Sequence, residues 1–287
     1  MQQSKIGNQL YLFSVSYPFL ASLAPAIASG PVNYFANFFR HLIRGRLSSP
    51  AESRQNDFMD KVAEMSSSLP SPEFKNLGIT EMTVLAQVIG PLLAGYDALA
   101  TTMSFLAYYL ASDPEKQDKV RAEIDAVFEA HDGTIKYEHL NELEYLSACV
   151  KETLRLAPPF IRPERICTKD WEYNGLKIKK GCVVMMPAWA ANRNPECFTN
   201  PDDFEPERFL EEQTGISQYG FTTFGHGPRN CIGAKFSTEA LKLVLCHLLR
   251  NFNFQLRPDT KIVYRPGVVF LLQYEPLFLD VVRRDLS

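Results

Sequence analysis

One cysteine in this chain lies in a segment with few bulky side chains. Residues 221–236 read FTTFGHGPRNCIGAKF, with three glycines, one proline and one arginine around Cys231. Apolar residues at helical spacing follow directly, through about residue 251. Because glycine-rich backbone can approach a ligand closely, the segment predicts a loop built around one thiol at the start of a helix.

The composition is that of a globular protein and excludes some classes of function. The chain has 287 residues, 46% of them hydrophobic and 22% charged, and a net charge of −3, so it can bury a large core. No basic stripe is present, and we expect no nucleic-acid partner. The six cysteines form no CxxC pair, which favours reduced thiols facing the cytosol over a disulfide framework. The histidine spacing does not support a zinc site.

The N-terminal region raises the question of a membrane. No charged residue occurs between Lys5 and Arg40, and an apolar run in this stretch is about long enough to cross a bilayer. Pro18, Pro25 and Pro31 interrupt it. Three interpretations stay open: a spanning helix, a loop that dips into the membrane, which we favour, and an ordinary buried segment.

The remaining patterns predict more helix than strand. WEYNGLKI predicts a hairpin with Asn174-Gly175 at its turn, CVVMMP predicts a strand, and strand-like runs close the chain. Helices are expected over residues 31–48, 57–65, 80–110, 111–130, 142–158 and 232–251. The fold class is therefore α+β and mostly α.

If Cys231 ligates a metal, the charge of its thiolate has to be stabilised. The N-terminus of the following helix favours an anion, and Gly227 and Gly233 let backbone N–H groups approach the sulfur. Arg229 adds a fixed charge that can also bind a carboxylate, and Phe224 adds an apolar wall. A haem fits the lack of other metal ligands in the sequence, because its own nitrogens supply four ligands to the iron. The alternative is a turn around a buried structural cysteine.

These residues carry a resemblance to a known family. Phe224-x-x-Gly227-x-Arg229-x-Cys231-x-Gly233 resembles the haem-binding loop of the cytochromes P-450, FxxGxRxCxG, at every fixed position. The resemblance implies the cytochrome P-450 fold, with a long central helix and small β-sheets, and haem b with Cys231 as the axial ligand of the iron. It points to the animal microsomal clan that includes broad-specificity drug and steroid oxidases and thromboxane synthase.

Further motifs follow the order of the family. Glu152-x-x-Arg155 resembles its ExxR helix, and Pro206–Phe209 reads PERF. The resemblance implies that Glu152, Arg155 and Arg208 form a buried charge network that supports the haem loop.

Other positions match ligand-binding positions of the family. Arg165 and Arg229 match residues that hold the haem propionates, bidentate binding for which arginine is suited. The resemblance also implies that five residues line the substrate cavity: Pro159, Phe160, Ile161, Phe270 and Leu271.

The oxygen-binding helix departs from the usual pattern. Ala94, Gly95 and Asp97 match it, but Ala98 stands where oxygen-activating relatives usually have a threonine, whose hydroxyl relays protons together with the acid. Thr102 lies four residues further on, about 6 Å along a helix axis. Two enzyme classes stay open: a monooxygenase with a weakened or water-mediated relay, and a haem-thiolate isomerase or dehydratase of a lipid peroxide or endoperoxide. Thromboxane synthase also lacks this threonine.

The resemblance further implies partners and a location. It implies a lipophilic substrate such as a steroid, fatty acid or xenobiotic, and electrons from NADPH through a reductase, with cytochrome b5 as an optional donor. The reductase is expected to dock near Arg193, Arg229 and Lys235. The expected location is the endoplasmic reticulum membrane, on the cytosolic face and at the membrane surface.

The resemblance also implies a domain organisation. Residues 1–287 are expected to form one catalytic domain that is incomplete at its N-terminus. Residues 1–77 would cover the cavity and residues 78–287 would bind haem. A truncated product without catalytic activity is the third hypothesis.

Overall fold

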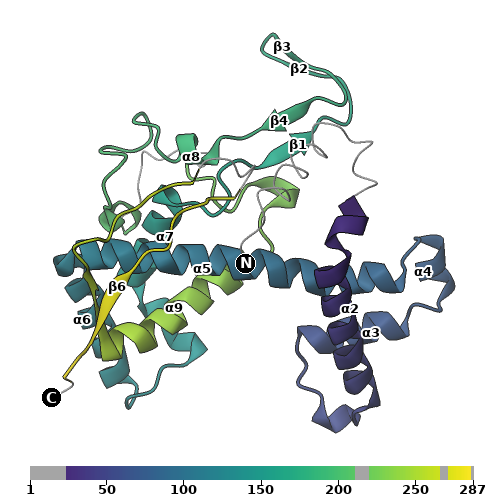
Figure 1. Ribbon diagram of the computed structural model, residues 1–287, viewed down its shortest axis with the longest axis horizontal. Helices are drawn as coiled ribbons and strands as arrows, with labels where there is room; N and C mark the ends of the chain where they lie inside the picture. The colour runs from purple at the N-terminus through teal and green to yellow at the C-terminus, as the bar shows by residue number, and fades with distance from the viewer. Residues whose placement is uncertain (1–23, 211–219, 266–270, 286–287) are drawn as a thin grey trace. The chain divides into compact units, whose positions relative to one another are not determined.

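The computed structural model describes residues 24–210, 220–265 and 271–285 (Figure 1). The chain divides into two compact units, Met1–Tyr96 and Asp97–Ser287. Helix α5 (Glu81–Ser112) contributes residues to both. Each unit has its own apolar core, and we describe each by itself.

The described part of the first unit is helical. Arg46 links the first two helices because its guanidinium pairs with Asp57, at 2.7 Å, and with Asp60, at 3.4 Å. Asp57 also caps the second helix by accepting a hydrogen bond from the backbone N–H of Asp60. The elements are α2 (Ala24–Ser48), the 3₁₀ turn η2 (Ala51–Ser53), α3 (Phe58–Ser67), α4 (Pro72–Asn76) and the first half of α5. They bury Ala36, Phe39, Ile43, Val62, Ala63, Val84, Leu85 and Val88.

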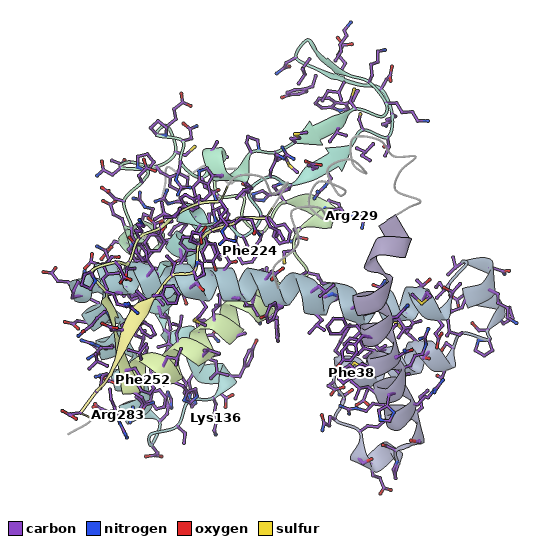
Figure 2. All side chains as sticks on the ribbon, in the orientation of Figure 1. Phe38, Lys136, Phe224, Arg229, Phe252 and Arg283 are labelled. Atoms are coloured by element: carbon purple, nitrogen blue, oxygen red, sulfur yellow. The ribbon has the colours of Figure 1, made fainter. Side chains whose placement is uncertain are left out.

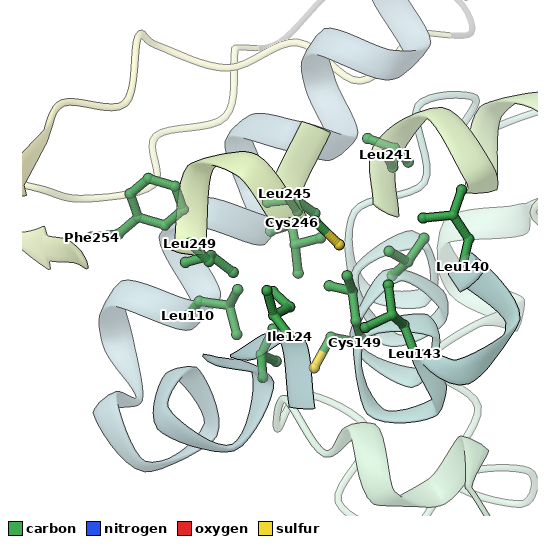
Figure 3. Close-up of a cluster of buried hydrophobic side chains, with 14 of the residues drawn as sticks. Leu110, Ile124, Leu140, Leu143, Cys149, Leu241, Leu245, Cys246, Leu249 and Phe254 are labelled. Atoms are coloured by element: carbon green, nitrogen blue, oxygen red, sulfur yellow. The ribbon is translucent and has the colours of Figure 1, made fainter. Parts of the chain in front are cut away.

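The second unit holds the larger core (Figure 3). Each of its main helices turns one apolar face inward, as the helical spacing predicts. The helices are the second half of α5, α6 (Pro114–Ala130), α7 (Glu144–Leu156), α8 (Ala188–Ala191) and α9 (Ala234–Asn251), with short 3₁₀ turns η3 (Tyr137–Glu142), η4 (Pro206–Phe209) and η5 (Gly227–Arg229). The core includes Leu106, Leu110, Ile124, Leu140, Leu143, Leu146, Cys149, Val150, Leu241, Leu245, Cys246, Leu249 and Phe254.

A buried glutamine joins three elements of this core. The side chain of Gln117 on α6 donates hydrogen bonds to the carbonyls of Leu110, at 3.0 Å, and Phe254, at 2.9 Å. It also accepts one from the N–H of Phe254 at 2.8 Å. All three bonds are buried, and they fix the start of α6 against the end of α5 and the strand that follows α9.

The described strands form three small antiparallel sheets. In the hairpin, Asn174 and Gly175 both have positive φ, 48° and 81°, which is the type I′ geometry that fits a two-residue turn. Figure 2 labels Phe252 and Arg283, which pair at one end of the last sheet. The pairs are β1 (Glu164–Ile166) with β4 (Val183–Met185), β2 (Trp171–Tyr173) with β3 (Leu176–Ile178), and β5 (Phe252–Leu256) with β6 (Leu279–Arg283).

Most of the predicted elements are confirmed, and the fold is mostly α with small sheets. Asp113 caps α6 and Pro114 occupies its first turn, and α5 continues through Pro91. One boundary was wrong: the helix expected from residue 31 begins at Ala24, because a proline removes one hydrogen bond without ending the helix here. Residues 1–23 of the proposed membrane segment lie outside the described residues. The single-domain organisation stays a prediction.

Helix α5 is the only described helix that is long and apolar enough to cross a membrane, judged by length and composition. Its second half nevertheless packs inside the protein. Phe105, Leu106 and Leu110 are fully buried, as in a core helix of a folded domain.

The packing of α9 gives the first prediction. Leu245 is fully buried, whereas Leu243 on the same helix is 38% exposed. We expect Leu245→Ala to lower the free energy of unfolding by about 2–5 kcal/mol, because it removes buried surface and leaves a cavity. Leu243→Ala should change it by about 0.5 kcal/mol or less. Urea unfolding followed by circular dichroism measures both, and equal losses would contradict this packing.

Candidate functional site

The loop that carries Cys231 is closed by its own backbone. The N–H of Cys231 donates to the carbonyl of Phe224 at 2.8 Å, and the N–H of Gly225 donates to that of Thr222 at 2.8 Å. A turn at Gly227, closed at 3.1 Å by the N–H of Asn230, lies between these bonds. The loop therefore has a defined backbone shape, closed by three main-chain hydrogen bonds.

Glycines are required at two points of this loop. Gly225 and Gly227 have φ of +69° and +74°, a region in which a side chain is strained. At Gly233 an added Cβ would lie 3.9 Å from the sulfur of Cys231, which is an ordinary contact distance. The glycine requirement of the loop therefore comes from the positive φ of Gly225 and Gly227.

The thiol lies at the mouth of a helix. Cys231 is exposed, and α9 begins three residues later with Gly233 as its N-cap, which offers no side-chain hydrogen bond. Unpaired N–H groups at a helix N-terminus favour an anion.

Two arginines lie beside the loop. The guanidinium of Arg165 on β1 donates to the carbonyl of Arg229 at 3.4 Å, and both side chains are exposed. Phe224 is partly buried and packs against the large core, which anchors the first residue of the motif. Figure 2 labels Phe224 and Arg229 in this loop.

Beneath the loop lies a buried ion network. Glu152 accepts hydrogen bonds from the guanidinium of Arg155 at 2.7 and 2.8 Å, and from that of Arg208 at 3.1 Å. Glu152 and Arg155 have no exposed side-chain surface, and Arg208 is 8% exposed. The carboxylate of Glu152 thus lies between two guanidinium groups, and all three charged groups are hydrogen-bonded. Buried charges are stable only when they are paired in this way.

The network also holds an irregular segment in place. Arg155 donates to the carbonyls of Asn192 at 2.9 Å, Pro201 at 2.6 Å and Asp203 at 3.0 Å, and the ring of Phe198 lies under its guanidinium, 4.9 Å away. Residues 192–205 have little regular structure of their own, so the arginine supplies partners that a helix or sheet would otherwise provide.

Comparison with known proteins identifies the family. The chain matches the Cytochrome P450 family over residues 1–280.

The chain belongs to the cytochrome P450 family.

Individual relatives support this family membership. The chain is 36% identical to cytochrome P450 3A5 of Homo sapiens over 284 residues, which is 97% of this chain and 56% of that protein. It is 40% identical to cytochrome P450 3A6 of Oryctolagus cuniculus over 236 residues, 82% of this chain and 46% of that protein. Cytochrome P450 3A1 of Rattus norvegicus is 36% identical over 285 residues, again 97% and 56%. The chain thus spans about half the length of these relatives.

Membership in the cytochrome P450 family implies haem b with a cysteine thiolate ligand, and the residues present fit this group. Cys231 is exposed, and the guanidinium of Arg165 reaches the backbone of Arg229 in the same loop. Both arginine side chains are exposed and can bind carboxylates. The individual roles of these residues stay predictions.

The expected oxygen-binding residues of the P450 helix divide between the two units. Ala94 and Gly95 belong to the first unit, and Asp97 and Thr102 to the second. Asp97 is exposed, while Thr102 is buried and donates its hydroxyl to the carbonyl of Ala98 at 2.8 Å. The Thr102 hydroxyl proton is therefore committed within its own helix. How Ala94 and Gly95 lie relative to Cys231 stays a prediction.

Four of the predicted cavity residues lie together. Phe160 forms an antiparallel bridge with Leu271, and the N–H of Leu272 donates to the carbonyl of Pro159 at 2.9 Å. Ile161 follows directly and packs on a small core around Phe105. The fifth residue, Phe270, lies outside the described residues.

One of the expected docking residues for a P450 reductase points inward. The side chain of Arg193 is 17% exposed, stacks on Trp189 with 3.8 Å between guanidinium carbon and ring centroid, and donates to the carbonyl of Leu156 at 2.5 Å. Its burial lowers the pKa of the guanidinium. Arg229 and Lys235 are exposed and stay available for a partner.

Sequence reasoning missed Asn192. Its buried side chain donates to the carbonyl of Arg155 at 3.2 Å and to the hydroxyl of Thr223 at 3.1 Å, and it accepts from the N–H of Thr222 at 3.3 Å. The hydroxyl of Thr223 donates in turn to the carbonyl of Leu154 at 3.0 Å. Asn192 therefore joins the ion network to the start of the cysteine loop. Nothing in the sequence distinguishes it from its neighbour Asn194, because its partners lie 30 or more residues away.

The ion network gives the second prediction. Glu152→Ala leaves the buried guanidinium of Arg155 without its carboxylate and removes one of the two carboxylates that pair with Arg208. We expect a loss of about 3–5 kcal/mol in the free energy of unfolding. Lys151→Ala, at an exposed position of the same helix, should change it by about 0.5 kcal/mol or less. Chemical denaturation of both variants tests this, and a Glu152→Ala protein as stable as the Lys151→Ala protein would show that the network is dispensable.

Asn192 gives the third prediction. Asn192→Ala leaves the N–H of Thr222 and the carbonyl of Arg155 without their side-chain partner, at a cost of about 1–3 kcal/mol. We expect a matching loss of stability and faster release of haem to an acceptor protein. Asn194→Ala is the control, since the Asn194 side chain bonds only within its own turn, to the N–H of Glu196 and the sulfur of Cys197. Haem release at the same rate in both variants would refute a role of Asn192 in holding the cysteine loop.

Proposed function

We propose that this chain is the haem-binding core of a monooxygenase that inserts one oxygen atom of O₂ into a lipophilic organic substrate. Steroids, fatty acids and xenobiotics are the substrate classes, and the electrons come from NADPH through a reductase. The observation that carries the proposal is the exposed thiol of Cys231, which lies at the N-terminus of α9 in a loop closed by backbone hydrogen bonds. Family membership supports it.

Each residue near the thiol has a role in this proposal. The sulfur of Cys231 would hold the haem iron, and the bound haem would supply the oxygen chemistry, which a thiolate supports by donating electron density. Arg165 and Arg229 would bind the carboxylates of the macrocycle with charge-assisted hydrogen bonds. Asp97 would hold a proton for this chemistry.

The substrate side of the site rests on apolar residues. Phe160 is 36% exposed and lies beside Leu271 across a backbone bridge, so both can present apolar surface to a lipophilic molecule. Residues 1–77 cover the cavity in this proposal and residues 78–287 hold the haem, within one catalytic domain.

A reductase and a membrane complete the proposal. Arg229 and Lys235 are exposed cations on the side of the cysteine loop, and an acidic reductase surface, or that of cytochrome b5, complements them. We place the protein at the endoplasmic reticulum membrane, on the cytosolic face.

A second function is favoured by one observation. Ala98 has no hydroxyl, and Thr102, four residues further along the helix, donates its hydroxyl to the carbonyl of Ala98. A proton relay through this helix is therefore weakened. A haem-thiolate isomerase or dehydratase of a lipid peroxide needs no relay, because its substrate already contains the O–O bond.

The fourth prediction tests the iron ligand. We expect the ferrous-CO complex of the haem-loaded chain to have the strongly red-shifted Soret band of thiolate ligation, because the sulfur donates electron density to the iron. Cys231→Ser should abolish this band, while Cys197→Ser, at another partly exposed cysteine, should leave it unchanged. A red-shifted band that survives in Cys231→Ser would overturn the proposal.

The fifth prediction separates the two functions. With NADPH and reductase, the monooxygenase proposal expects oxygenated product, and Ala98→Thr should raise its yield because the hydroxyl is restored. Conversion of a fatty-acid endoperoxide without NADPH, at a rate that Ala98→Thr leaves unchanged, would instead establish the isomerase. Single-turnover assays of both proteins distinguish these outcomes.

A further inference from the structure

Two cysteines lie opposite each other in the β1–β4 ladder. The last regular pair is Ile166 with Val183, so the next pair is Cys167 with Cys182. Their backbones remain joined, because the N–H of Cys167 donates to the carbonyl of Cys182 at 2.9 Å. The N–H of Gly181 donates to the carbonyl of Cys167 at 2.7 Å, and Gly181 has φ of +88°. This is the pattern of a bulge with glycine in its first position, in which Gly181 and Cys182 together oppose Cys167.

The pairing brings the two thiols within range of each other. In a regular ladder, directly opposite residues that share a hydrogen bond have Cα atoms about 5.5 Å apart and project side chains to the same face of the sheet. We infer a similar separation for Cys167 and Cys182 beside the bulge. Disulfides span Cα distances of about 4.4–6.8 Å. Both cysteines are free thiols; Cys182 is exposed and Cys167 is half-buried.

The two buried cysteines provide a contrast. Burial raises the pKa of the Cys246 thiol to about 12 and that of Cys149 well above its usual value, and both lie in the large core (Figure 3). Because the thiolate is the reactive form, these two are inert. Cys197 has no cysteine opposite it in any described strand pair.

We propose that Cys167 and Cys182 form a dithiol modification site that closes to an intramolecular disulfide in the presence of a small-molecule disulfide such as oxidised glutathione. One cysteine attacks the glutathione disulfide and releases one glutathione thiol. The second cysteine then attacks the resulting mixed disulfide and releases the other. Two protein thiols are oxidised by two electrons, the glutathione disulfide is reduced to two thiols, and the two protons pass to them.

The surroundings suit this reaction. Lys169 and Lys180 are exposed next to the two cysteines and attract an anionic peptide such as glutathione. The sulfur of Cys167 now donates to the carbonyl of Lys169 at 2.9 Å. For the disulfide to form, the Cys167 side chain has to rotate away from the carbonyls of Lys169 and Ile178.

The disulfide would act next to the candidate haem site. Arg165 lies on β1, two residues before Cys167. A disulfide at this end of the ladder would therefore tie β1, which carries Arg165, to β4. The proposal itself does not depend on haem, and its test does not use enzyme activity.

Peptide mapping tests the site directly. The full chain is incubated with oxidised glutathione, free thiols are alkylated, and the protein is digested with trypsin without reduction. Cleavage separates the two cysteines, so the expected product is the peptide ICTK (residues 166–169) linked to GCVVMMPAWAANR (residues 181–193). We expect this linked pair to be at least tenfold more abundant than any other linked pair. Cys167 and Cys182 found only as alkylated thiols or separate mixed disulfides would overturn the proposal.

Matched variants complete the test. In Cys182→Ser, no second thiol can resolve the first product, so a mixed disulfide of Cys167 with glutathione should accumulate. Cys197→Ser should leave the yield of the linked pair unchanged. A linked pair whose yield falls as much in Cys197→Ser as in Cys182→Ser would show that the link forms by exchange through Cys197, and this too would contradict the site.

Discussion

The carboxylate of Glu152 is the interaction on which the site depends. It accepts hydrogen bonds from both Arg155 and Arg208 with no exposure to solvent. A buried carboxylate of this kind is stable only while both guanidinium groups stay in place. Because Arg155 also binds three carbonyls of the irregular segment, one charge cluster fixes a part of the chain that has few backbone hydrogen bonds of its own.

Asn192 extends this order to the cysteine loop. It bonds to Arg155 on one side and to Thr222 and Thr223 on the other, and Phe224 follows as the first residue of the haem-binding motif. The shape of the loop beyond that point comes from backbone bonds and two left-handed glycines. The thiol is thus positioned by a hydrogen-bonded path that starts at α7, while α9 supplies the favourable electrostatic field.

Much of this arrangement could be predicted from the sequence, and the limits have physical causes. Helical periodicity and the Asn174-Gly175 turn depend on local spacing, so the sequence alone predicts them. The motif around Cys231 likewise predicts a glycine-containing loop followed by a helix. The partners of Asn192, the inward position of Arg193 and the bulge at Gly181 depend on contacts between distant segments. The start of α2 at Ala24 could not be predicted from proline positions alone, since a proline lowers helix stability without fixing where the helix begins.

Hydrogen exchange at the backbone amide of Cys231 tests the central claim most directly, because this N–H closes the loop onto Phe224. The loop is held by the path through Asn192, so the account predicts that Asn192→Ala speeds exchange at this amide by about tenfold or more, the equivalent of about 1.4 kcal/mol, while Asn194→Ala leaves it unchanged. If the Cys231 amide exchanges equally slowly in both variants, the claim that Asn192 holds the loop is contradicted.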